Sequence, residues 1–261
     1  MKTLKSIKDN SYAIYGLGLS GVSTFKFLKK KGVKKIYTWD DNKHKTNKKK
    51  FNLFKKILDK VDYIVISPGI NIQHSKFQLK LLRNKKKIIT DLDLFYMQKI
   101  PIKSIVITGT NGKSTVSKLI QHIFKTSGLD AQLGGNIGKP VLDLKIKKKS
   151  IIVIEASSFQ LSYTKFIKPN FAIILNITSD HLDWHNTIAN YRKSKLNIFS
   201  NQDINDIALL NDKKLIKIFY RNNYSSKLKI IKKYFLNSTI KKKITNDYLI
   251  SEPNLENLAF A

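Results

Sequence analysis

The stretch ITGTNGKST, residues 107–115, places glycine, lysine and hydroxyl residues in the order used by phosphate-binding loops. The general pattern is G-x-x-x-x-G-K-[ST], with four residues between the glycines. Gly112, Lys113 and Ser114 fit its second half, but the upstream glycine is Gly109, and only Thr110 and Asn111 lie between. The stretch is therefore either a shorter phosphate cradle or a glycine turn before a solvated lysine.

The surroundings of this loop favour a cradle. A buried strand is predicted over residues 104–108 and a helix over 113–127, in which apolar residues recur at helical spacing. Backbone N–H groups of the loop would hold phosphate oxygens, Lys113 would supply the counter-charge, and Ser114 or Thr115 would bind magnesium. The residues expected to contact a nucleotide are Gly109, Thr110, Asn111, Gly112, Lys113, Ser114 and Thr115.

Two later strands carry acids and histidines at their carboxyl ends. Glu155 ends the apolar strand 151–155, where an unpaired carboxylate is costly, so it is either a magnesium ligand or an acid that emerges into solvent. The stretch NITSDHLDWH begins at the carboxyl end of a predicted strand over residues 171–176. It holds four such residues: Asp180, His181, Asp183 and His185. Open α/β sheets bind ligands at this edge, which predicts a site here.

A lysine lies within an apolar helical stripe further along. At about 100° per residue, a helix over 186–199 places Lys195 near the centre of the arc formed by its apolar residues, with Lys193 on the opposite side. A lysine in a buried stripe is expensive unless it is paired or chemically altered. The alternative is that the long side chain reaches out to solvent.

A second glycine motif, YGLGLSG, occurs near the start of the chain. Gly16, Gly18 and Gly21 follow a predicted strand over residues 12–15 and open a helix, and Asp40 ends the next predicted strand. This is the pattern of a pyrophosphate at a helix N-terminus with an acid on a ribose. It does not separate a dinucleotide from a nucleoside-diphosphate sugar, and an ordinary tight turn is the alternative.

The chain contains two successive series of alternating strand and helix patterns, which predicts an α/β protein with parallel sheets. Around residues 99–103 the alternation starts afresh. We expect a Rossmann-like domain over residues 1–98 and a P-loop-type ATP-binding domain over residues 99–261. Residues 213–247 are lysine-rich and show little pattern.

Composition excludes some classes of function. The formal net charge is +31, but only three of the 49 basic residues are arginine, namely Arg83, Arg192 and Arg221. Nucleic-acid readers rely on arginine, so we attribute the charge to lysines on solvated faces and expect no nucleic-acid partner. The chain has no cysteine, no apolar leader and no apolar run long enough to span a bilayer. A cytoplasmic monomer is expected.

Taken together, these motifs resemble the Mur ligase family of peptidoglycan synthesis. The short loop in TGTNGKST is similar to that family's own phosphate loop. Four further motifs resemble those of the branch of the family that adds D-glutamate. They are YGLGLSG, SPGI at 67–70, GGNIG at 134–138 and EASSFQL at 155–161. The resemblance runs from about residue 14 to residue 211 and returns only at NLEN, residues 254–257.

The resemblance implies an ATP-dependent ligase that joins D-glutamate to UDP-N-acetylmuramoyl-L-alanine through an acyl phosphate, with ATP and two Mg²⁺ ions as cofactors. It implies that Lys113 binds phosphates and that one Mg²⁺ is held by Ser114 and Glu155. His181 would hold the second Mg²⁺, and Lys195 would be a CO₂-derived carbamate that acts as a metal ligand. The remaining implied contacts are Asn136 and Ser157 to the substrate, Leu19, Ser20 and Asp40 to the UDP group, and Asn254 and Asn257 to adenine.

Two departures from the family pattern bear on activity. Family members have a third domain, which brings most of the D-glutamate site, and this sequence ends before it. The family's histidine before the Asn-x-x-Asn pair is Pro253 here. We therefore keep as an alternative a truncated homologue that binds UDP-N-acetylmuramoyl-L-alanine or ATP without turnover. A dinucleotide-dependent oxidoreductase is disfavoured, because such an enzyme has no need of a second phosphate loop.

Overall fold

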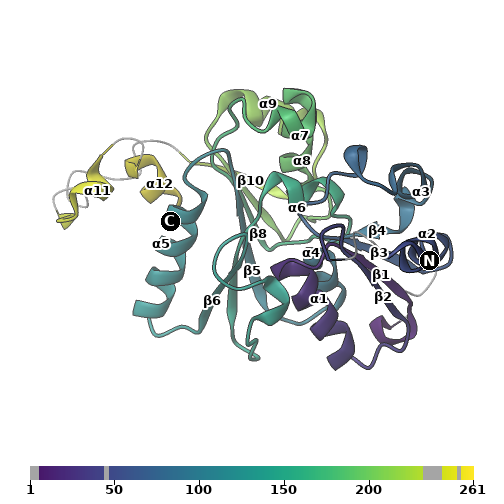
Figure 1. The fold of residues 1–261 in the computed structure, drawn as a ribbon. Coiled ribbons are helices and arrows are strands. Elements are labelled where there is room, and N and C mark those ends of the chain that lie inside the picture. Colours follow the sequence, from purple (N-terminus) through teal and green to yellow (C-terminus); the bar gives the residue numbers. More distant parts are fainter. Residues whose placement is uncertain (1–5, 44–46, 232–242, 252–253) are drawn as a thin grey trace. The chain divides into compact units, whose positions relative to one another are not determined.

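The computed structural model describes residues 6–43, 47–231, 243–251 and 254–261, so Pro253 and part of the 213–247 segment lie outside the described residues. The chain divides into two compact units, each described below by itself (Figure 1). Unit 1 takes the described residues of Met1–Ile100 with Pro140–Asp143 and Tyr163–Phe166, and unit 2 takes those of Pro101–Lys139, Leu144–Ser162 and Ile167–Ala261. The prediction from the sequence assigned residues 99–261, and with them both short segments, to the second domain.

The described part of unit 1 is a parallel sheet with strand order β2-β1-β3-β4 and flanking helices. Its strands are β1 (Tyr12–Tyr15), β2 (Ile36–Trp39), β3 (Tyr63–Ile66) and β4 (Ile88–Ile89). Its helices are α1 (Leu19–Lys30), α2 (Lys48–Ile57), α3 (Gln78–Arg83) and α4 (Asp91–Met97). The alternating order along the chain produces this arrangement, because parallel neighbours need crossover connections.

Strand β1 is buried on both faces, and its alternating side chains feed two separate cores. Ala13 and Tyr15 pack into a cluster that contains Trp39. Tyr12 and Ile14 point the other way and pack into a second cluster. Because each face of the sheet is covered, the strand reads as a continuous apolar run rather than as an alternating one.

A buried carboxylate joins helix α4 to the returning segment Tyr163–Phe166 of unit 1. Asp93 is fully buried and completes a capping box with Thr90, whose N–H lies 2.8 Å from the carboxylate. The N–H groups of Lys165 and Phe166 donate to its other oxygen at 2.8 and 2.6 Å. Burial raises the pKa of Asp93 to about 6, against the opposing effect of these backbone donors.

This carboxylate predicts a specific pH dependence of stability. Its folded pKa lies above its unfolded value, so it stabilises the fold at pH 4 and that contribution disappears as the pH rises through about 6. The contribution to the free energy of unfolding that is lost in this way is about 3 kcal/mol. We expect Asp93→Asn to remove this decline in unfolding free energy between pH 4 and 6.5, measured by urea titration. Thr90→Ala, which keeps the carboxylate, should retain the decline, and equal slopes in all three proteins would contradict the prediction.

Unit 2 is built on a larger parallel sheet, whose described strands have the order β10-β9-β8-β5-β7-β6. The strands are β5 (Lys103–Thr108), β6 (Ala131–Gly135), β7 (Ile151–Glu155), β8 (Phe171–Ile174), β9 (Ile207–Leu210) and β10 (Lys227–Ile230). The helices are α5 (Lys113–Thr126), α6 (Ser158–Tyr163), α7 (Leu182–His185), α8 (Ile188–Leu196), α9 (Lys213–Arg221), α11 (Asp247–Ile250) and α12 (Asn254–Phe260). Helices α5 and α12 lie side by side (Figure 1).

The predicted α/β class with parallel sheets is confirmed, but several elements differ from the sequence prediction. The helix expected from residue 186 begins at Ile188, because Asn186 has a φ of 65° and cannot continue a right-handed helix. Helix α9 lies in the segment that showed little pattern. Among the described residues, no helix combines the length and the apolar character needed to cross a membrane.

Candidate active site

The glycine-rich loop of unit 2 joins β5 to the N-terminus of α5, as a phosphate loop requires. Gly112 caps the helix with a φ of 82°, in the left-handed region. A Cβ at this position would lie 2.2 Å from Oδ1 of Asn257. The backbone conformation therefore favours glycine here, and any larger residue would also have to displace the Asn257 side chain.

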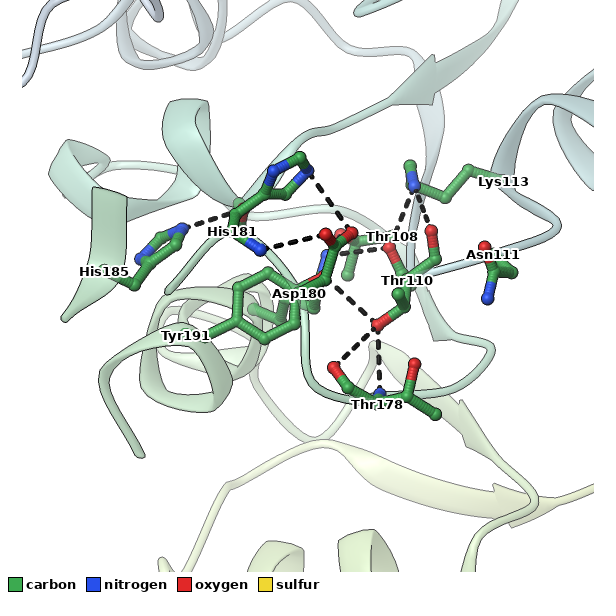
Figure 2. Close-up of polar contacts among 12 residues, drawn as sticks. Thr108, Thr110, Asn111, Lys113, Thr178, Asp180, His181, His185 and Tyr191 are labelled. Carbon is green, nitrogen blue, oxygen red and sulfur yellow. Dashed lines mark hydrogen bonds and ion pairs between the residues drawn. The ribbon is translucent and has the colours of Figure 1, made fainter. Parts of the chain in front are cut away.

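Two lysine amines converge on one carbonyl of this loop. The Lys113 Nζ donates to the Gly109 carbonyl at 3.0 Å and to the Thr110 carbonyl at 2.7 Å (Figure 2). The Lys195 Nζ donates to the same Gly109 carbonyl at 2.7 Å and lies 4.6 Å from the centroid of the Tyr191 ring. The sequence prediction that Lys195 lies in a buried stripe is confirmed, since the residue is only 1% exposed.

The pKa of Lys195 falls to about 7. Burial is the largest cause, the nearby charge of Lys113 adds to it, and Asp180 acts weakly in the opposite direction. Burial also lowers the pKa of Lys113, against the attraction of Glu155 and Asp180. No salt bridge to Lys195 occurs within the described part of the chain. A substantial fraction of this amine is therefore unprotonated at neutral pH.

Glu155 lies beside the loop and connects two further predicted site residues. It is 1% exposed at the end of β7, so it does not emerge into solvent. The Ser114 hydroxyl donates to one carboxylate oxygen at 2.7 Å, and the Asn136 side-chain amide donates to the other at 2.8 Å. Thr115, the alternative magnesium ligand, faces Tyr248 instead, at 3.3 Å between hydroxyls.

The four acids and histidines of the NITSDHLDWH stretch do not form one cluster. His181 has a half-exposed side chain 3.4 Å from Asp180 and a left-handed φ of 51° (Figure 2). Asp183 is exposed, whereas His185 is buried away from the loop. Burial, followed by the charges of Lys195 and His181, lowers the pKa of His185 to about 4. Within the described ranges, no group of three His, Cys, Asp or Glu residues is arranged to hold a metal.

Asn176 is a site residue that the sequence analysis missed. Its side-chain oxygen accepts the N–H groups of Thr110 and Asn111 at 3.1 and 2.9 Å, so the end of β8 fixes the shape of the loop. The Thr110 hydroxyl lies 3.1 Å from the Tyr191 hydroxyl and also contacts residue Thr178 (Figure 2). The position of Asn176 at a strand end was the available signal.

The other residues predicted in unit 2 have local partners. Ser157 and Gln160 form a reciprocal pair at the start of α6, with N–H to side-chain oxygen distances of 3.1 and 3.3 Å. This arrangement is a capping box. Asn254 and Asn257 are both buried, and the Asn257 amide donates to the Asn254 side chain at 3.1 Å. The Asn257 side chain thus lies beside Gly112 of the loop, and its own hydrogen bond is made within α12.

The glycine motif of unit 1 forms a tight strand-to-helix turn. Gly16 has a φ of 92°, and a Cβ on Gly21 would meet the Gly16 carbonyl at 1.9 Å. Asp40 accepts the Leu17 N–H at 2.7 Å and the Asn42 N–H at 3.0 Å, so its carboxylate already shapes this turn. Burial tends to raise the pKa of Asp40, but these hydrogen bonds and Lys43 lower it overall. The predicted substrate residues Leu19 and Ser20 follow in the first turn of α1, with Leu19 83% exposed.

The parallel sheet, the short glycine loop at the N-terminus of α5 and the adjoining serine–glutamate pair define a P-loop-type α/β protein. A family model described as "Mur ligase middle domain" matches residues 107–255, which is more than half of the chain. A second, described as "Mur ligase MurD-like, N-terminal domain", matches residues 10–89. The chain belongs to the Mur ligase family, and the sequence resemblance to that family is confirmed.

Curated proteins named UDP-N-acetylmuramoylalanine–D-glutamate ligase are similar to this chain. That of Hydrogenobaculum sp. is 34% identical over 96% of this chain and 60% of its own length. That of Clostridioides difficile is 38% identical over 81% of this chain and 50% of its own. That of Aquifex aeolicus is 37% identical over 77% and 46%. The chain thus spans about half the length of these relatives.

One solved structure supports the fold alone. The UDP-N-acetylmuramate:L-alanyl-gamma-D-glutamyl-meso-diaminopimelate ligase of Neisseria meningitides has a TM-score of 0.53 and 14% sequence identity. The similarity covers 85% of this chain and 77% of that one.

Proposed function

We propose that this chain provides the UDP-sugar-binding and ATP-binding parts of a ligase that joins D-glutamate to UDP-N-acetylmuramoyl-L-alanine in peptidoglycan biosynthesis. The observation that carries the proposal is the buried Lys195, which shares the Gly109 carbonyl with Lys113 and has a pKa near 7. The names of the similar curated proteins support the choice of substrates. A cytoplasmic location and a monomeric state are part of the proposal.

The proposed reaction is a phosphoryl transfer followed by an acyl transfer. The substrate carboxylate attacks the γ-phosphorus of ATP, the bond to the β,γ-bridging oxygen breaks, and an acyl phosphate and ADP form. The amine of D-glutamate then attacks the acyl carbon and releases phosphate and a proton, which leaves an amide. Lys113 and the loop N–H groups would stabilise the charge that develops on the phosphoryl oxygens.

The residues present fit a magnesium site beside the loop. A serine hydroxyl and a carboxylate in contact are a donor set suited to Mg²⁺, which keeps several waters and takes few protein ligands. Ser114 and Glu155 would hold one ion, and His181 with a modified Lys195 would hold a second. When bound, the ions would neutralise the β- and γ-phosphate charge.

Lys195 is suited to carbamylation by its position and its chemistry. Its unprotonated amine would attack CO₂, form an N–C bond and lose one proton, so that a neutral amine becomes a negatively charged, carboxylate-like group. Among the described residues no carboxylate lies within salt-bridge distance of this buried amine, and a carbamate would remove its uncompensated positive charge. The modification would therefore add an oxygen ligand for the second ion, beside His181.

The remaining predicted residues would bind the two nucleotides and the acceptor. In unit 1, Leu19, Ser20 and Asp40 would contact the UDP group, with Asp40 acting partly through the turn that it shapes. In unit 2, Asn136 and Ser157 would orient the acceptor. Asn254 and Asn257 would approach adenine from α12, whose contact with Gly112 supports this role.

The proposal is tested by measuring phosphate release from ATP by the 261-residue chain with UDP-N-acetylmuramoyl-L-alanine, in the presence and absence of D-glutamate. An amide product establishes the ligase. Binding of both nucleotides without product supports the alternative of a binding homologue. Binding of NADH, with no binding of ATP or of the UDP substrate, overturns the proposal.

A substitution at Glu155 tests the magnesium assignment separately. Glu155→Gln keeps the size of the side chain and removes its charge, so we expect the Mg²⁺-dependent gain in ATP affinity to fall at least about tenfold. ATP affinity in EDTA should change little. Both affinities can be measured by calorimetry, and an unchanged gain with Mg²⁺ would remove Glu155 from the site. Asp183→Asn, an exposed acid in the same unit, is the control.

A further inference from the structure

His185 lies at a junction of three segments that carry proposed metal ligands. Its Nε2 lies 3.0 Å from the Ser158 hydroxyl at the start of α6, three residues beyond Glu155. Its Nδ1 lies 3.5 Å from the hydroxyl of Ser194, the residue before Lys195. Its own N–H donates to the carbonyl of His181 at 3.0 Å. One residue thus contacts the segments that carry three of the four proposed ligands, namely Glu155, His181 and Lys195.

The two ring nitrogens of His185 face hydroxyls on two different helices. The Ser194 hydroxyl also donates to the Asn190 carbonyl at 2.9 Å and accepts from the Ser162 hydroxyl of α6 at 2.8 Å. A neutral imidazole offers one donor and one acceptor, and here both are used between α6 and α8.

The ring is also clamped by aromatic neighbours. It stacks on Phe159 with an interplanar angle of 7° and a centroid distance of 5.7 Å. The ring of Tyr191, which precedes Lys195 by one helical turn, meets it edge-on at 5.1 Å (Figure 2). Tyr191 also lies under the Lys195 amine. The His185 ring therefore contacts the surroundings of Lys195 through Tyr191 as well as through Ser194.

We infer that His185 is a positioning residue, which fixes the segments of Glu155, His181 and Lys195 relative to one another so that their ligand atoms can converge on metal. The inference rests on the proposed function. His185 acts through its contacts with Ser158 and Ser194.

The test compares the full chain with His185→Phe, which keeps a flat ring and loses both nitrogens, and with His185→Gln, which keeps an amide able to reach one hydroxyl. His122→Phe, on the exposed face of α5, is the control. Two quantities are measured: the Mg²⁺-dependent gain in ATP affinity, and the carbamate signal after ¹³CO₂ labelling, by ¹³C NMR. We expect the gain to fall at least about tenfold in His185→Phe, the signal to weaken, and His185→Gln to recover part of both.

The outcomes separate the inference from the function on which it rests. If wild type binds ATP better with Mg²⁺ and His185→Phe retains the full gain, the inference is wrong. An equal loss of ATP affinity with and without Mg²⁺ in His185→Phe also overturns it, because that is the result of general destabilisation. A wild type that has the Mg²⁺ gain but no carbamate signal refutes the carbamate alone. A wild type without ATP binding refutes the proposed function.

Discussion

Replacing Lys195 with methionine is expected to make the unliganded chain more stable and, at the same time, to abolish substrate-dependent phosphate release. The amine is buried with a pKa lowered to about 7, so its protonated form opposes folding at neutral pH. Methionine has a similar length and no charge. In CO₂-free buffer, where Lys195 is a free amine, we expect the free energy of unfolding at pH 7 to rise by about 3 kcal/mol. With CO₂ present, we expect turnover to fall at least about a hundredfold.

The sign of this effect can be checked by changing the pH. The folded pKa of Lys195 lies below its unfolded value of 10.5, so the unfolded chain binds more protons between pH 7 and 10.5. Wild-type stability should therefore gain a contribution from this group as the pH rises through that window, and the advantage of Lys195→Met should shrink accordingly. Unfolding by urea at pH 6.5 and pH 9.5 measures both.

Lys193→Met provides the matched control, because Lys193 is exposed on the other side of the same helix. We expect its unfolding free energy to stay within about 0.5 kcal/mol of wild type and its activity to be unaffected. A Lys195→Met protein that is less stable than wild type at pH 7 would show that the amine contributes more through its hydrogen bond to Gly109 than it loses through burial. Full turnover in that variant would remove Lys195 from the site.

Gly112→Ala is expected to destabilise the chain and to weaken ATP binding strongly. The new methyl group meets the Asn257 side chain at 2.2 Å, and the left-handed backbone disfavours any residue with a Cβ. We expect a loss of about 2–4 kcal/mol in unfolding free energy. Nucleotide affinity, measured by calorimetry, should fall at least about tenfold because the loop N–H groups are displaced.

The variant Gly128→Ala distinguishes the cost of the left-handed backbone from the cost of the contact with Asn257. Gly128 has a similar φ of 76° but open space where a Cβ would lie. Gly128→Ala should lose only the conformational part, about 1–2 kcal/mol, and keep its ATP affinity. The double variant Gly112→Ala/Asn257→Ala should recover part of the stability lost by Gly112→Ala, since its clash is gone. If Gly112→Ala and Gly128→Ala behave alike, the contact with α12 has no energetic role.

The sequence predicted most of the central strands and both glycine loops, because these depend on local patterns. Apolar runs such as residues 151–155 mark strands covered on both faces, and the spacing of Gly112-Lys113-Ser114 marks the loop. The edge strands β6 and β10 were missed. β6 has two glycines and a glutamine among its five residues, and β10 alternates lysine with apolar residues, so neither resembles a buried strand.

The contacts within the site depended on long-range geometry that local patterns do not encode. Asp180, His181, Asp183 and His185 are neighbours in sequence, but the left-handed residues His181 and Asn186 bracket a short helix and turn the side chains in different directions. The anchoring of the loop by Asn176 joins residues 65 or more positions apart. Helical spacing placed Lys195 among apolar residues, but only the structure shows that its amine stays buried instead of reaching solvent.

The return of residues 163–166 to unit 1 has a consequence for the order in which the protein can fold during synthesis. The N–H groups that satisfy Asp93 come from Lys165 and Phe166, 72 and 73 positions later in the chain. Strands β5, β6 and β7 of unit 2 emerge from the ribosome before those donors do. Unit 1 therefore cannot complete its buried polar contacts first, as an N-terminal domain usually would, and must wait for part of unit 2 to be made.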